Sequence, residues 1–69
     1  MVKLYAIIDG ENQAVAKLSD KDNKKIGRGY DVGHSFGIVT DQDTGRQFEV
    51  FQANCGADNC NCAVTVEEQ

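Results

Sequence analysis

The chain of 69 residues has no tryptophan, no proline and only two tyrosines and three phenylalanines. Its strongly apolar residues are few. A domain this short also buries only about 60% of the surface that its unfolded chain would expose. We therefore expect a thin core and a stability of only ~3–5 kcal/mol unless a metal, a disulfide or a partner subunit adds to it. The length allows one domain at most, spanning residues 1–69.

A long hydrophobic run is also missing. The apolar segment from Leu4 to Ile8 ends at Asp9 and is too short for a signal-peptide core or a membrane span. We therefore expect a cytoplasmic protein without membrane contact. Thiols are kept reduced in that compartment, so clustered cysteines there act as metal ligands, packing groups or redox groups more often than as structural disulfides.

Positive charge is nearly absent from the second half of the chain. Residues 31–69 contain one basic residue and seven acidic ones, a net charge of −6, whereas residues 1–30 contain six basic residues and four acidic ones, a net charge of +2. A general nucleic-acid binder needs a basic face to neutralise phosphates, so this distribution argues against one. The acidic half suits a surface that meets a basic partner.

The N-terminal half predicts two strands joined by a tight turn. Apolar residues alternate with a period of two in Val2–Ile8 and in Gln13–Ser19, with Ala14, Ala16 and Leu18 sharing one face of the second strand. Asp9-Gly10 between them supplies the positive φ angles of a hairpin turn. We expect a polar loop over 19–25 and a short strand over 26–30.

The C-terminal half predicts a second hairpin and a last strand. Phe36–Thr40 and Gln47–Ala53 flank the turn-forming segment 41–46, and residues 61–68 alternate again. If Phe48 and Val50 point inward, Phe51 points outward beside Glu49, either exposed or buried in a subunit interface. The chain is thus predicted to be all-β, a small antiparallel barrel or curled meander of five to six short strands.

Two segments could be specific ligand sites instead of ordinary turns or loops. Asp41, Asp43 and Gly45 partly resemble a calcium loop, but its closing glutamate is missing, and the same segment followed by an aromatic strand also resembles an RNA-recognition loop. A basic and aromatic patch could contact a phosphate or a single strand; its members are Lys24, Lys25, Arg28 and Tyr30. A solvated loop beside a strand edge is the interpretation that we favour there.

All three cysteines lie within eight residues, as Cys55, Cys60 and Cys62. Three thiolates could hold Zn or Cu(I), with His34 or Asp58 as a fourth ligand for zinc, although the C-x4-C-x-C spacing is not that of known zinc knuckles. A disulfide from Cys55 to either of the others is a second alternative. The interpretation that we favour is packing, because Cys62 shares a face with two valines, Val64 and Val66.

A Cys/His enzyme is the remaining alternative, with His34 as the base, but no oxyanion donors are evident to complete the site. We therefore predict a small non-enzymatic binding module with no cofactor, which contacts another protein and acts as an acidic inhibitor or adaptor of a basic partner. A second copy of the chain is an alternative partner, and nucleic acid is not expected. The predicted partner-binding residues, all of which we expect to be exposed, are Asp41, Asp43, Glu49 and Phe51.

Overall fold

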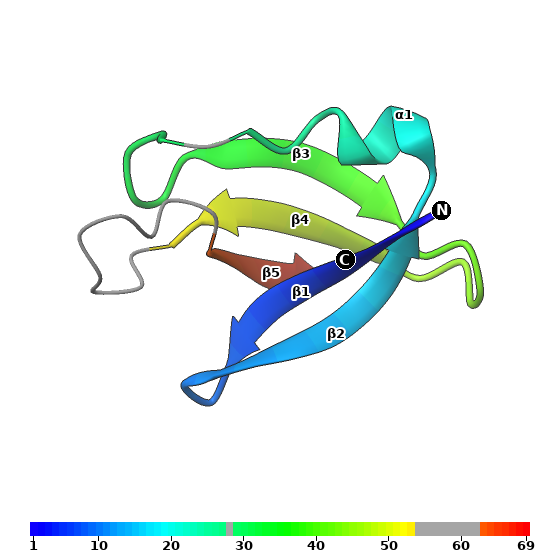
Figure 1. Ribbon diagram of the computed structural model, residues 1–69, viewed down its shortest axis with the longest axis horizontal. Helices are drawn as coiled ribbons and strands as arrows, with labels where there is room; N and C mark the ends of the chain where they lie inside the picture. Colours follow the sequence, from blue (N-terminus) through cyan, green and yellow to red (C-terminus); the bar gives the residue numbers. More distant parts are fainter. Residues whose placement is uncertain (28, 54–62) are drawn as a thin grey trace.

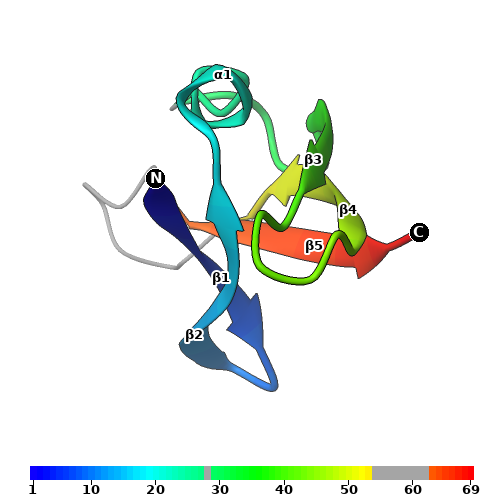
Figure 2. The ribbon, with the colours of Figure 1, turned by 90° about the vertical axis from the view of Figure 1, so that its right-hand side faces the viewer.

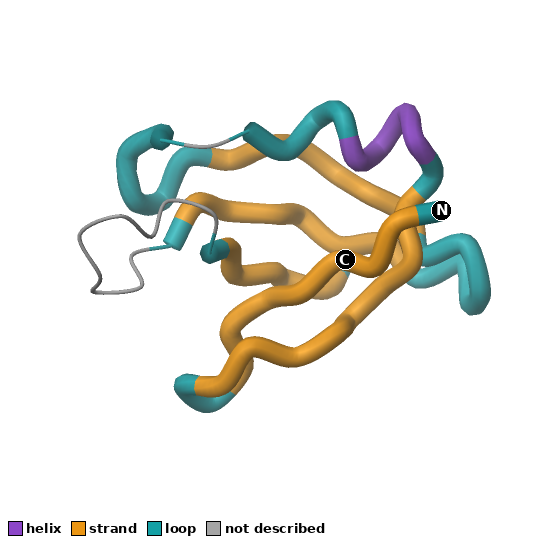
Figure 3. Tube along the Cα trace, in the orientation of Figure 1, coloured by secondary structure: helices purple, strands orange, loops and turns teal. Residues whose placement is uncertain are grey.

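A computed structural model describes residues 1–27, 29–53 and 63–69. The described residues form five antiparallel strands and one short helix (Figures 1 and 3). The elements in chain order are β1 (Val2–Ile8), β2 (Glu11–Leu18), α1 (Asp20–Asn23), β3 (Ser35–Thr40), β4 (Gln47–Gln52) and β5 (Val64–Glu68). The prediction of an all-β fold is confirmed.

The first hairpin forms where the sequence predicts it. Asp9 and Gly10 have φ angles of 52° and 79°, as a two-residue turn with both central residues left-handed requires. β2 begins two residues before the predicted start, at Glu11. The prediction that Ala14 shares a face with Ala16 and Leu18 is wrong, because the register shifts by one residue and leaves Val15 in a bulge. Ala14 is exposed as a result, and Val15 packs against the core.

The second sheet has the strand order β3-β4-β5, and its first hairpin is also confirmed. Gly45 closes the predicted turn with a φ angle of 77°. A further bulge precedes Gly37, whose φ angle is 98°, and this extra residue lets both Phe36 and Val39 face the core although they are three positions apart. β4 alternates as predicted, with Phe48 and Val50 buried.

The two sheets pack together around one small core, with β1 beside β5 and β2 beside β3 (Figures 1 and 2). Among the described residues no ladder joins the sheets, so the strands form a curled, open arrangement rather than a closed barrel. A backbone hydrogen bond links β2 to the turn after β3, from the Gln42 N–H to the Lys17 carbonyl at 2.8 Å. The buried apolar residues are Leu4, Ala6, Ala16, Leu18, Phe36, Val39, Phe48, Val50 and Val64.

The segment between the sheets differs from the prediction. Residues 19–25 were expected as a loop, but α1 forms there because the Ser19 hydroxyl accepts the Asp22 N–H at 3.2 Å and caps the helix. The strand predicted over 26–30 is not found among its described residues. Instead the Tyr30 ring lies against Gly27, where a Cβ would stand 2.5 Å from Tyr30 Cε2.

Candidate protein-interaction surface

The outer face of the three-stranded sheet brings together two of the predicted partner-binding residues. Phe48 and Val50 point into the core, so Glu49 and Phe51 of β4 point away from it. The strand register places Ile38 of β3 and Glu67 of β5 beside Glu49. It places Thr65 of β5 beside Phe51. We define the outer face as Ile38, Glu49, Phe51, Thr65 and Glu67.

Apolar and acidic side chains are mixed on this outer face. Ile38 and Phe51 are both half-buried, so their side chains keep part of their apolar surface in water. Glu49 lies between them on the sheet, directly opposite Ile38 and next to Phe51 along β4. The outward orientation of Phe51, which its sequence parity predicts, is confirmed.

Two carboxylates stand directly opposite each other on the outer face. Glu49 of β4 pairs in register with Glu67 of β5, and like charges at such positions destabilise a sheet. Within the described part of the chain neither side chain makes an ion pair. The Ser35 hydroxyl donates to Glu49 Oε2 at 2.6 Å and so fixes the position of that carboxylate. The pair therefore concentrates negative charge at a stability cost to the fold.

Arg46, the one basic residue of residues 31–69, pairs with Glu68 and not with Glu49 or Glu67. Its guanidinium donates to both carboxylate oxygens of Glu68, including a 2.8 Å bond from Nε, and it lies over the Phe48 ring at 5.4 Å. These hydrogen bonds lower the pKa of Glu68 and raise that of Arg46. Glu68 is thus neutralised internally, in contrast to Glu67 one residue earlier.

Asp41 and Asp43 lie away from the outer face, in the turn between β3 and β4. The prediction that Asp41 is exposed is wrong, because only 8% of its surface is accessible. Its carboxylate accepts the Lys17 N–H at 3.0 Å, the Asp43 N–H at 3.2 Å and the Thr44 hydroxyl at 2.7 Å. These bonds, that from Lys17 foremost, hold the pKa of Asp41 below its usual value.

The turn around Asp41 therefore joins the two sheets. The Asp41 carboxylate accepts the Lys17 N–H, and the Gln42 N–H donates to the Lys17 carbonyl. Both backbone groups of Lys17 at the edge of β2 are therefore hydrogen-bonded. The Asp43 carboxylate stays exposed and pairs with the Lys17 ammonium at 3.3 Å. A shallow cavity of about 180 Å³ opens beside this turn. The sequence could have revealed this role only if the β2–β3 contact had been foreseen.

Phe36 anchors an aromatic cluster that holds the long connection before β3. The rings of Tyr30 and His34 stack at 4.4 Å, and both meet the Phe36 ring edge-on, at 5.3 and 5.1 Å. The Lys25 ammonium, another member of the predicted basic patch, is bonded to the Ile38 carbonyl and to Asp22. Tyr30 and Lys25 thus have structural contacts that the sequence did not indicate.

The predictions for the cysteines fall on Cys55, Cys60 and Cys62, which lie outside the described residues. Among the residues that are described, no three His, Cys, Asp or Glu side chains gather as a metal site. The predicted facing of the last strand is confirmed at Val64, which is 2% exposed. The metal, disulfide and packing alternatives for the thiols all remain predictions.

Thiol labelling of the native protein discriminates between these alternatives. If the cysteines serve packing, we expect rapid modification of Cys55 and slow modification of Cys62, because a thiol in apolar surroundings has little thiolate. If a metal holds them, all three thiols should be protected until a chelator is added, and the chelator should unfold the chain. Intact mass under native conditions reports the same difference.

No family model, curated protein or solved structure matches this sequence. No helix among the described residues is long and apolar enough to cross a membrane.

Proposed function

We propose that this chain is a non-enzymatic protein-interaction module whose outer face binds a basic surface of a partner protein. The observation that supports this most directly is the register of Glu49 and Glu67, which aligns two negative charges on adjacent strands. Ile38 and Phe51 supply apolar contact area beside these charges. A lysine or arginine from a partner, placed between the two carboxylates, would remove their repulsion and turn a stability cost into binding energy.

A basic partner fits this face better than a second copy of the chain. Two copies joined face to face about a two-fold axis would bring four carboxylates together, two from each Glu49 and Glu67 pair. Within the part of the chain that the structure describes, the cavity beside Asp41 holds about 180 Å³, less than the ~300–1,000 Å³ of small-molecule sites. The function that we propose is that of an adaptor or inhibitor that acts by surface contact.

Substitution of Glu67 by lysine should change stability and binding in opposite directions. The new ammonium would face Glu49 across the strands and replace a repulsive pair by an attractive one, so the free energy of unfolding should rise by roughly 0.2–1 kcal/mol. Binding to a basic peptide of alternating lysine and valine should weaken by ~10-fold or more. Urea unfolding and fluorescence anisotropy measure the two effects.

The matched control is Glu11→Lys, which makes the same change in net charge at an exposed position of β2. Its affinity for the peptide should stay within about twofold of the wild type at about 0.15 M ionic strength, where a Debye length of about 8 Å screens the effect of charges far from the binding face. Equal weakening by Glu67→Lys and Glu11→Lys would mean that net charge alone attracts the peptide, and the proposal would fail.

Phe51→Ser tests the apolar part of the same face. Because Phe51 points away from the core, we expect it to weaken peptide binding more than it lowers the melting temperature. Phe48→Ser, on the buried side of the same strand, should instead unfold the chain. If Phe51→Ser proves as destabilising as Phe48→Ser, Phe51 belongs to the core and the face is smaller than proposed.

A further inference from the structure

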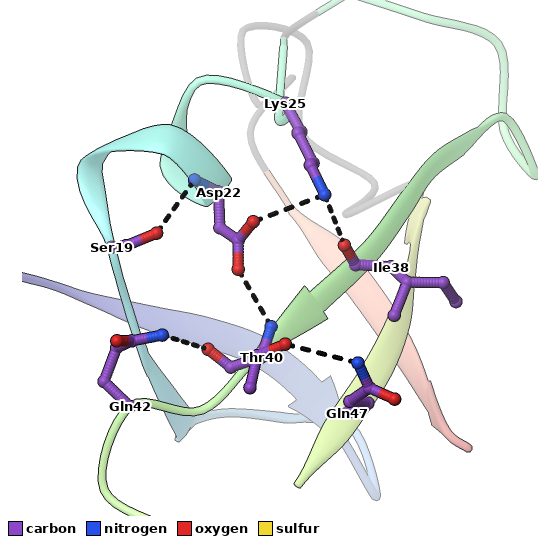
Figure 4. A network of polar contacts seen from close by, with 7 residues as sticks. All are labelled: Ser19, Asp22, Lys25, Ile38, Thr40, Gln42 and Gln47. Carbon is purple, nitrogen blue, oxygen red and sulfur yellow. Dashed lines mark hydrogen bonds and ion pairs between the residues drawn. The ribbon is translucent and has the colours of Figure 1, made fainter. Parts of the chain in front are cut away.

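The free edge of β3 is closed by side chains instead of a neighbouring strand. The Lys25 ammonium donates to the Ile38 carbonyl at 2.7 Å, and the Thr40 N–H donates to Asp22 Oδ2 at 2.9 Å (Figure 4). The two side chains also pair with each other, Lys25 Nζ to Asp22 Oδ1 at 3.3 Å. β3 is the outer strand of its sheet, so these backbone groups point away from β4.

This ion pair reproduces the hydrogen bonds that an added strand would make. Ile38 and Thr40 are two residues apart, the spacing at which an edge strand presents successive outward carbonyl and N–H groups. A donor from Lys25 and an acceptor from Asp22 match that order. The Ser19 hydroxyl accepts the Asp22 N–H and so holds Asp22 at the start of α1. The hydrogen bond from the Thr40 N–H holds the pKa of the Asp22 carboxyl below its usual value. We name the Asp22–Lys25 pair the β3 latch.

We propose that the β3 edge accepts an extended, basic segment of the partner as an additional strand, and that the β3 latch occupies this edge in the free protein. This inference rests on the proposed function, because it names how the basic partner binds. Strand addition to an exposed edge is a common mode of peptide recognition. The bulge before Gly37 interrupts the edge, so the added strand is centred on Ile38–Thr40.

The charge of the neighbouring outer face selects the occupant. Residues of an added strand would lie beside Ile38, and Ile38 lies beside Glu49 in the sheet. A lysine on the added strand is long enough to pass over Ile38 and bring its ammonium to the Glu49 carboxylate, while its backbone bonds to β3. Lys25 is the partner that leaves the edge more readily, because its side chain is 39% exposed whereas that of Asp22 is 14% exposed.

The test compares two lysines that lie next to each other in sequence. Lys25→Ala removes the latch, whereas Lys24→Ala makes the same charge change at an exposed lysine at the end of α1. We expect Lys25→Ala to bind the alternating lysine–valine peptide about 5-fold more tightly than Lys24→Ala, because the edge no longer has to open. Peptide binding should also slow hydrogen exchange of the Ile38 N–H. Equal affinities of the two variants would overturn the latch.

A peptide methylated on every backbone nitrogen of its lysine–valine segment, so that neither of its edges can donate a hydrogen bond, separates this inference from the proposed function. It keeps every positive charge but cannot form a ladder, so its affinity should fall by ~10-fold or more. If it binds as well as the parent peptide and Glu67→Lys still weakens it, the outer face binds cations and strand addition is wrong. If Glu67→Lys has no effect while Lys25→Ala and methylation do, the edge site stands and the proposed acidic face fails.

Asp22→Asn is a second variant that tests the latch in case Lys25→Ala does not fold. The asparagine oxygen still accepts the Thr40 N–H but no longer attracts the Lys25 ammonium, so the peptide should bind more tightly than to wild type, with a smaller gain than in Lys25→Ala. Circular dichroism confirms that each variant is folded before binding is measured. Weaker binding by both folded variants would show that the pair supports the site and does not block it.

Discussion

Replacement of Leu18 by alanine should leave most molecules unfolded at 25 °C. Leu18 ends β2 and is completely buried between the two sheets. Loss of a buried leucine side chain costs about 2–5 kcal/mol, which is comparable to the ~3–5 kcal/mol expected for the whole domain. Urea unfolding followed by circular dichroism should therefore show a midpoint close to zero denaturant.

The control for Leu18→Ala is its direct partner on β1. Val2 pairs with Leu18 in register but is 40% exposed, so Val2→Ala should change stability by only ~0.5 kcal/mol. Hydrogen exchange tests a further consequence. Because the described sheets are joined mainly by apolar packing, Leu18→Ala should remove amide protection from β3, β4 and β5 as well as from β1 and β2. Persistent protection of the three-stranded sheet would make the two sheets independent units.

Both hairpins could be predicted because their signals are local. Asp9-Gly10 and Gly45 require positive φ angles, and the alternation of Phe48 and Val50 sets the facing of β4 within a few residues. The same parity places Glu49 and Phe51 on one face. Turn chemistry and a period of two depend only on neighbours in sequence, so they remain valid whatever the rest of the chain does.

The errors arise where a distant contact decides the local structure. The bulge at Val15 reverses the facing of Ala14, and no residue near it signals an extra position. α1 is a single capped turn without apolar periodicity, so residues 19–25 resembled a solvated loop. Ser19 followed by acidic residues was the available signal, since a serine cap with Asp20 and Asp22 in the first turn favours a helix start.

The candidate surface was half predictable for the same reason. Glu49 and Phe51 follow from strand parity, but Glu67 joins them only through the register between β4 and β5. That register is a property of two strands together, which alternation within one strand cannot determine. Likewise, Lys25 and Asp22 reach the β3 edge from a segment whose fold was misjudged. Strand parity predicts the outward orientation of Glu49 and Phe51, but not which residues of neighbouring strands lie beside them.

Replacement of Asp41 by alanine should lower the melting temperature by several degrees, far more than Asp43→Ala. The Asp41 carboxylate accepts three hydrogen bonds, and one of them, from the Lys17 N–H, links β2 to the turn after β3. Removal of the Asp41 carboxylate would leave the Lys17 N–H unpaired at the junction of the two sheets. Asp43 contributes only an exposed ion pair through its carboxylate. Similar losses in both variants would mean that the junction does not depend on Asp41.

The same carboxylate should make stability depend on pH. Hydrogen bonds lower the pKa of Asp41 in the folded state, so the unfolded state binds a proton first as the pH falls. The Asp41 contribution is therefore complete above the unfolded pKa of about 3.9 and is lost as the pH falls through that value toward the lower folded pKa. Asp41→Asn keeps one acceptor oxygen but cannot titrate, so its melting temperature should approach that of the wild type as the pH falls toward 2. Asp22 and Glu68, whose pKa values are lowered as well, titrate in both proteins and cancel in this comparison. A difference between wild type and Asp41→Asn that stays constant from pH 7 to pH 2 would contradict a structural role for the ionised carboxylate.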